Sequence, residues 1–116
     1  MAITIIKKPI NLNELKTIAK EEFGNVVKAV VDIEQEIMAI GGELHADEEA
    51  LLIEKESSNR ENTWGINLYT EEFGDEFIKF DSMVNIKPAF GNRSRRVENQ
   101  AVREQIETIV RKLIEP

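Results

Sequence analysis

The stretch TWGINLYTEEFGDEFIKFDSMVNIKP, residues 63–88, contains two runs in which apolar and polar residues alternate, with a polar loop between them. In the first run, residues 63–69, Trp64, Ile66 and Leu68 fall on one face of an extended chain. Such alternation is typical of antiparallel strands that are buried on one face only. The stretch therefore predicts a β-hairpin in an antiparallel sheet.

The second run, residues 77–88, alternates with the same period until Pro88 ends it. Its predicted inward residues are Ile78, Phe80, Val84 and Ile86, and its predicted outward residues are Lys79, Asp81, Met83, Asn85 and Lys87. Further strands are expected at residues 3–6 and within residues 26–42, which are rich in β-branched side chains. Residues 26–42 read as a hairpin that turns near Gln35, with a single bent strand as the alternative.

Two segments have helical spacing. Residues 11–23 begin with Asn11 as a candidate cap and have Glu14 at the capping-box position. The final helix is expected from residue 100 onward with Asn99 as its cap, and its last turn is basic, which suits the negative end of the helix dipole.

Residues 46–54 contain good helix formers, but the short apolar piece and the polar loop after it favour a strand. The order of elements predicts an α+β fold, in which an antiparallel β-meander is covered on one face by the N-terminal and C-terminal helices. A length of 116 residues fits a single domain over residues 1–116.

Composition excludes several functional classes. The absence of cysteine removes disulfides, thiolate nucleophiles and cysteine-ligated metals, and it fits a cytoplasmic protein. We see no apolar run of membrane-spanning length and no secretory signal, so we expect a soluble, unexported protein. The net charge of −7 argues against nucleic-acid binding, because a negative protein repels phosphate backbones.

The acidic stretch GGELHADEEA, residues 41–50, holds the only histidine. On an extended chain His45 and Asp47 point the same way and form a candidate metal pair, to which Glu43 or Glu48 adds an oxygen. His45 is also a candidate acid–base group, although no nucleophile motif accompanies it. The competing interpretation is a solvated acidic loop.

A second candidate is GNRSRR, residues 91–96, where Arg93 and Arg95 offer guanidinium groups that match carboxylate or phosphate oxygens. The alternative is that these arginines pair with the acidic first half of the chain. A third candidate is the outward face of the predicted hairpin, where Asn67, Asp81 and Asn85 form a polar ligand surface together with Tyr69. Such a surface is equally typical of a solvent-facing strand.

The segments KAVVDIEQEIMAIGGELHADEEALLIE, TWGINLY, FIKFDSMVNIKP and GNRSRRVEN, with the closing helix, together resemble a family of small, uncharacterised prokaryotic proteins with a domain-of-unknown-function label. The resemblance covers nearly the whole chain. It implies a bacterial or archaeal cytosolic origin, and it implies no activity, cofactor or catalytic residue.

We therefore expect a small binding or interaction module for an anionic small molecule or an acidic partner segment, in which Arg93 and Arg95 contact the anion. The alternative is a metal-assisted hydrolase centred on His45 and Asp47. A third hypothesis is a homo-oligomer joined at the edge strand of residues 3–6. The sequence implies no particular cofactor.

Overall fold

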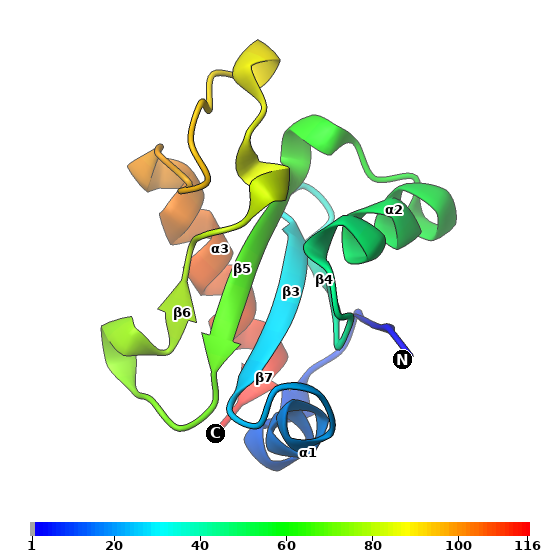
Figure 1. Ribbon diagram of the computed structural model, residues 1–116, viewed down its shortest axis with the longest axis vertical. Helices are drawn as coiled ribbons and strands as arrows, with labels where there is room; N and C mark the ends of the chain where they lie inside the picture. The colour runs from blue at the N-terminus through cyan, green and yellow to red at the C-terminus, as the bar shows by residue number, and fades with distance from the viewer. Residues whose placement is uncertain (1) are drawn as a thin grey trace.

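Five short strands form one antiparallel sheet in the computed structural model, which describes residues 2–116 (Figure 1). The strand order is β1-β4-β3-β5-β6. At the centre, β3 (Val26–Asp32) pairs with β5 (Thr63–Tyr69) along the whole length of both strands. β4 (Ile37–Ile40) and β1 (Thr4–Ile6) extend the sheet on one side, and β6 (Ile78–Lys79) extends it on the other. The predicted α+β class and antiparallel sheet are confirmed.

Within residues 2–116, three α-helices pack on the two faces of this sheet. The buried residues of α1 (Leu12–Glu22) and α3 (Gln100–Leu113) form one core cluster with Val27 and other odd-numbered residues of β3. Leu52 of α2 (His45–Glu56) belongs to a separate cluster with Val30. Successive residues of a strand point to opposite faces, so α2 lies across the sheet from α1 and α3, in front of it in Figure 1.

The strand predicted at residues 46–54 is wrong, because this segment lies within α2. Asp47 and Glu48 fall in the first turn, where acidic side chains suit the helix dipole, and Leu52 is fully buried against the sheet. Ser57 then adopts a left-handed conformation, and the Ser58 N–H bonds the Leu52 carbonyl at 3.3 Å. The polar loop that suggested a short strand contains the last residues of this helix and the connection to β5.

The predicted helix starts are confirmed. The side-chain oxygen of Asn11 accepts from the Glu14 N–H at 2.9 Å, and that of Asn99 accepts from the Val102 N–H at 3.2 Å. The residues just before α1 and just after α3 pair as a small parallel ladder, β2 (Ile10–Asn11) with β7 (Ile114–Glu115). Residues 26–42 form a hairpin, β3 and β4, and not a single bent strand. Within residues 2–116 no helix has the length and apolar character of a membrane span.

The strand predicted over residues 77–88 is confirmed only at β6. Beyond Lys79 the chain continues through two 3₁₀ turns, η3 (Met83–Asn85) and η4 (Pro88–Phe90). Backbone bridges between Asp81 and Arg96 and between Lys87 and Asn92 close residues 80–97 into an irregular hairpin. Asn85 and Lys87 were predicted to point outward, but both are buried.

The cause of this irregularity is the contact between Asn85 and Gly65. The Gly65 N–H donates to Asn85 Oδ1 at 2.8 Å, and Asn85 Nδ2 donates to the Gly65 carbonyl at 3.0 Å. The side-chain amide thus makes the two hydrogen bonds that a neighbouring strand would make. Gly65 is required there because an added Cβ would lie 2.5 Å from the Ser82 Cβ.

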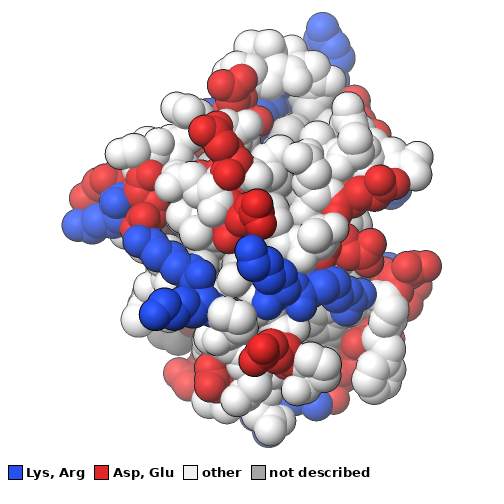
Figure 2. Space-filling model, turned by 180° about the vertical axis from the view of Figure 1, so that it is seen from behind, with Lys and Arg blue, Asp and Glu red and all other residues white. Residues whose placement is uncertain are grey.

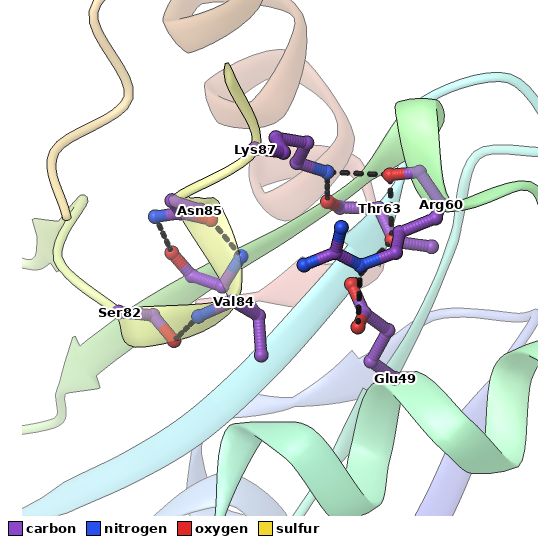
Figure 3. A network of polar contacts seen from close by, with 8 residues as sticks. Glu49, Arg60, Thr63, Ser82, Val84, Asn85 and Lys87 are labelled. Carbon is purple, nitrogen blue, oxygen red and sulfur yellow. Dashed lines mark hydrogen bonds and ion pairs between the residues drawn. The ribbon is translucent and has the colours of Figure 1, made fainter. Parts of the chain in front are cut away.

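Lys87 is another buried polar residue of this hairpin (Figure 3). Its ammonium donates to the carbonyls of Arg60 and Thr63 and lies 4.1 Å from the centre of the Trp64 ring. Burial lowers the pKa of Lys87 to about 8, and the negative charge of Glu49 opposes that shift. Two carbonyls and an aromatic face occupy the donors of the ammonium, which fits a structural role.

We predict that Asn85→Ala destabilises the protein by at least about 2 kcal/mol, because it leaves the buried N–H and C=O of Gly65 without partners. Urea denaturation followed by tryptophan fluorescence measures this. Asn13→Ala, at an exposed position of α1, is the matched control and should change stability by less than about 0.5 kcal/mol. Equal stability of the two variants would contradict the role assigned to Asn85.

Candidate functional site

A cleft of about 640 Å³ lies over the polar face of the sheet, between the start of α2 and the segment from Asp81 to Val84. Five residues that the sequence singled out line it, namely His45, Asn67, Tyr69, Asp81 and Arg95. They come from α2, β5 and the two sides of the irregular hairpin, so only the fold brings them together.

The floor of the cleft is a row of three polar side chains on neighbouring strands. Lys28 of β3 lies opposite Asn67 of β5, and Asn67 lies opposite Lys79 of β6. Lys28 Nζ donates to the Glu43 carbonyl at 2.8 Å, and Lys79 Nζ pairs with Glu76 at 2.7 Å. These bonds hold both ammonium groups beside the cleft. The Glu76 carboxylate compensates part of the positive charge of Lys79.

His45 forms the wall on the α2 side. Its Nε2 lies 2.7 Å from the Ile66 carbonyl, which accepts only, so Nε2 carries a proton and Nδ1 is the acceptor in the neutral ring. Burial is the main cause that lowers the pKa of His45. The hydrogen bond to the Ile66 carbonyl raises this pKa, and the positive charge of Lys28 lowers it further. His45 is therefore neutral at pH 7 and acts as a hydrogen-bonding group, not as a cation.

Asp81 and Arg95 form the opposite wall. The Arg95 carbonyl accepts from the Ser82 N–H and from Asn85 Nδ2, both at 3.0 Å, so the backbone of Arg95 is fixed beside Asp81. The ion pairs found within residues 2–116 involve neither the Asp81 carboxylate nor the Arg95 guanidinium. Two opposite charges thus line one cleft without neutralising each other.

The remaining predicted site residues lie elsewhere. Arg93 does not line the cleft; its backbone N–H, like that of Ser94, donates to Glu98. Asn85, predicted as a ligand contact on the outer face, is buried and bonded to backbone groups. It shapes the cleft wall and does not face a ligand.

The geometry also separates the proposed metal pair. His45 and Asp47 belong to the first turn of α2, where residues two apart point in nearly opposite directions, and Asp47 does not line the cleft. The assumption of an extended chain was wrong here. Among residues 2–116 no group of three or more His, Asp or Glu side chains is placed to hold a metal ion.

The paired glycines beside His45 have a clear structural purpose. Gly41 has φ +89°, which favours glycine, and the Gly42 N–H donates to Glu48 Oε2 at 2.9 Å. A Cβ on Gly42 would lie 3.0 Å from the Glu48 Cγ. Glu48 Oε1 is buried without a partner within residues 2–116, and burial raises the pKa of Glu48 to about 9.

The sequence did not identify Lys28, Leu44 or Met83 as residues of the cleft. One signal was available for Lys28, because an antiparallel register that pairs Val31 with Trp64 also places Lys28 opposite Asn67. The places of Leu44 and Met83 depend on the start of α2 and on the irregular hairpin, and no local pattern indicates either.

The fold and the cleft define a small α+β protein with a polar cleft on one face of an antiparallel sheet. The chain belongs to the family described as "Protein of unknown function (DUF5674)", whose family model matches residues 4–113. The resemblance to a domain-of-unknown-function family is confirmed. Neither the curated proteins nor the solved structures gave a match.

We predict that the stability of the protein falls as pH rises from about 6.5 to about 8, because Glu48 stays protonated in the folded state and ionises in the unfolded state over this range. Below this range the lowered pKa of His45 acts in the opposite direction, and above it the lowered pKa of Lys87 does so. The limiting slope is about 1.4 kcal/mol per pH unit. Glu48→Gln cannot ionise and should flatten the slope, whatever its effect on stability at pH 5.

Glu54→Gln, on an exposed position of the same helix, is the matched control and should keep the wild-type slope. Urea denaturation at five pH values measures the slope. A Glu48→Gln slope equal to that of the wild type would mean that the buried carboxyl is ionised in the folded protein.

Proposed function

We propose that this protein is a binding module that takes a small anionic molecule in the cleft. The observation that carries the proposal is that Arg95 lines the cleft and its guanidinium takes part in none of the ion pairs found within residues 2–116. A planar guanidinium donates two parallel hydrogen bonds to a carboxylate or phosphate. Arg95 is the residue that contacts the anion directly in this proposal.

Two further groups support an anion at this position. Lys28 adds a positive charge on the floor, held in place by its bond to the Glu43 carbonyl. The first turn of α2 borders the cleft at His45 and Ala46, and no side chain caps its N-terminus. Uncapped N–H groups and the helix dipole both favour a negative ligand.

The size and the setting of the cleft favour a small molecule over an acidic partner segment or a nucleic acid. A volume of about 640 Å³ is within the usual range for small-molecule sites. On the opposite face, basic side chains form a broken band with acidic side chains above and below it (Figure 2). This mixture of charges, with the net charge of −7, supports the expectation that nucleic acids are not partners.

A cytoplasmic location is part of the proposal, and the absence of cysteine supports it. Hydrolase chemistry is not proposed, since Asp47 lies outside the cleft.

The test is a ¹⁵N NMR titration with inorganic phosphate and with acetate at low ionic strength. We expect saturable chemical-shift changes at residues that line the cleft in the wild type. Binding should be at least tenfold weaker in Arg95→Gln, because the guanidinium that contacts the anion is lost. Arg93→Gln removes the same charge from an exposed position outside the cleft and should bind like the wild type. Equal loss in both variants would indicate a general charge effect, and no loss in Arg95→Gln would overturn the proposal.

A further inference from the structure

The charged groups of the cleft that remain free are of both signs. Lys79 pairs with Glu76 and Lys28 bonds the Glu43 carbonyl, whereas the side chains of Arg95 and Asp81 are absent from the ion pairs within residues 2–116. Asp81 and Arg95 lie on bridged segments, since the Ser82 N–H bonds the Arg95 carbonyl at 3.0 Å and a backbone bridge joins Asp81 to Arg96. A ligand in the cleft therefore meets a free guanidinium and a free carboxylate together.

This arrangement discriminates among anions. A ligand that carries only negative charge is attracted by Arg95 and Lys28 and repelled by the Asp81 carboxylate. A ligand with a carboxylate and an ammonium group satisfies both side chains with charge-assisted hydrogen bonds. The cleft is thus more complementary to a zwitterion than to a simple anion.

Two exposed apolar side chains stand at the same cleft. Leu44 is 56% exposed and Met83 is 65% exposed, and they line opposite walls, at the start of α2 and in η3. Leu44 occupies the N-cap position of α2, where a polar residue would stabilise the helix by about 1 kcal/mol. Contact with an apolar group of a ligand would explain why Leu44 occupies a position that favours a polar residue.

We propose that the ligand of the cleft is a small amino carboxylate with an apolar side chain, of the size of an apolar amino acid or a dipeptide. Its carboxylate contacts Arg95, its ammonium contacts Asp81, and its side chain lies against Leu44 and Met83. This inference rests on the proposed anion site and adds the ammonium and the apolar group. The volume of about 640 Å³ accommodates either size, with water in the remaining space.

The experiment compares matched probes by NMR titration of the intact protein. L-Leucine and L-leucyl-L-leucine have all three groups, 4-methylpentanoate lacks the ammonium, isopentylamine lacks the carboxylate, and glycine lacks the side chain. We expect at least one of the two zwitterions with apolar side chains to bind at least tenfold more tightly than each incomplete probe, because each incomplete probe leaves one wall of the cleft without its contact.

Variants assign each contact. Asp81→Asn should weaken binding of the complete zwitterion about tenfold, whereas 4-methylpentanoate should bind as well as before or better. The substitution leaves the backbone bridge to Arg96 in place, because that bridge does not involve the carboxylate. Leu44→Ser should reduce the preference over glycine. Phe73→Ser changes an 85% exposed apolar residue outside the cleft and should leave every affinity unchanged.

The outcomes separate this inference from the proposal on which it rests. If 4-methylpentanoate binds as tightly as both zwitterions and Arg95→Gln abolishes binding of each, the anion site stands and the amino carboxylate is wrong. If phosphate binds at Arg95 and no amino carboxylate does, the inference is likewise overturned. If none of the probes, including phosphate and acetate, shifts the cleft residues, both are wrong.

Discussion

The side-chain amide of Asn85 takes the place of a neighbouring strand beside Gly65, and the wall of the cleft depends on this contact. Asn85 bonds both backbone groups of Gly65, and its Nδ2 also donates to the Arg95 carbonyl. One planar group thus ends the β5–β6 ladder and fixes the chain that carries Arg95. A regular strand would have met the same hydrogen-bonding needs of Gly65 in the plane of the sheet, but it would not have formed the segment from Asp81 to Val84 that lines one side of the cleft.

The polar groups around the cleft differ in what they contribute. Lys87 and Glu48 are buried and bonded to backbone groups, so they fix the two elements between which the cleft opens. Asp81 and Arg95 are exposed and unpaired with each other, so they remain free to contact a ligand. The division follows from burial, since a buried side chain makes its hydrogen bonds inside the protein and an exposed one is solvated until a ligand replaces the water.

The regular parts of the fold were predictable from the sequence because their signals are local. Asn11 and Asn99 cap the helices that they were expected to cap, and the alternation in residues 63–69 corresponds to β5. The failures came from tertiary contacts. Residues 46–54 form part of a helix because Leu52 packs on the sheet, and residues 80–88 leave the sheet because of the buried amide of Asn85.

The candidate site was predictable in part for the same reason. Asn67 and Asp81 were placed on a common surface from strand alternation, and both line the cleft. His45 and Arg95 were identified by residue type alone, and only the fold could bring them to that surface. Arg93 is two residues from Arg95 but lies outside the cleft. Residues 80–97 form an irregular hairpin, so residues two apart do not point the same way as they would in a regular strand.

The most direct measurement of the central contact is the hydrogen-exchange rate of the Gly65 amide in the wild-type protein. The Asn85 oxygen holds this N–H at 2.8 Å in a buried position, so we predict that it exchanges only through global unfolding, as slowly as its most protected neighbours in β5. Exchange of the Gly65 amide at the rate of an exposed edge-strand amide would contradict the account, because residues 80–97 would then not be fixed on β5 by Asn85.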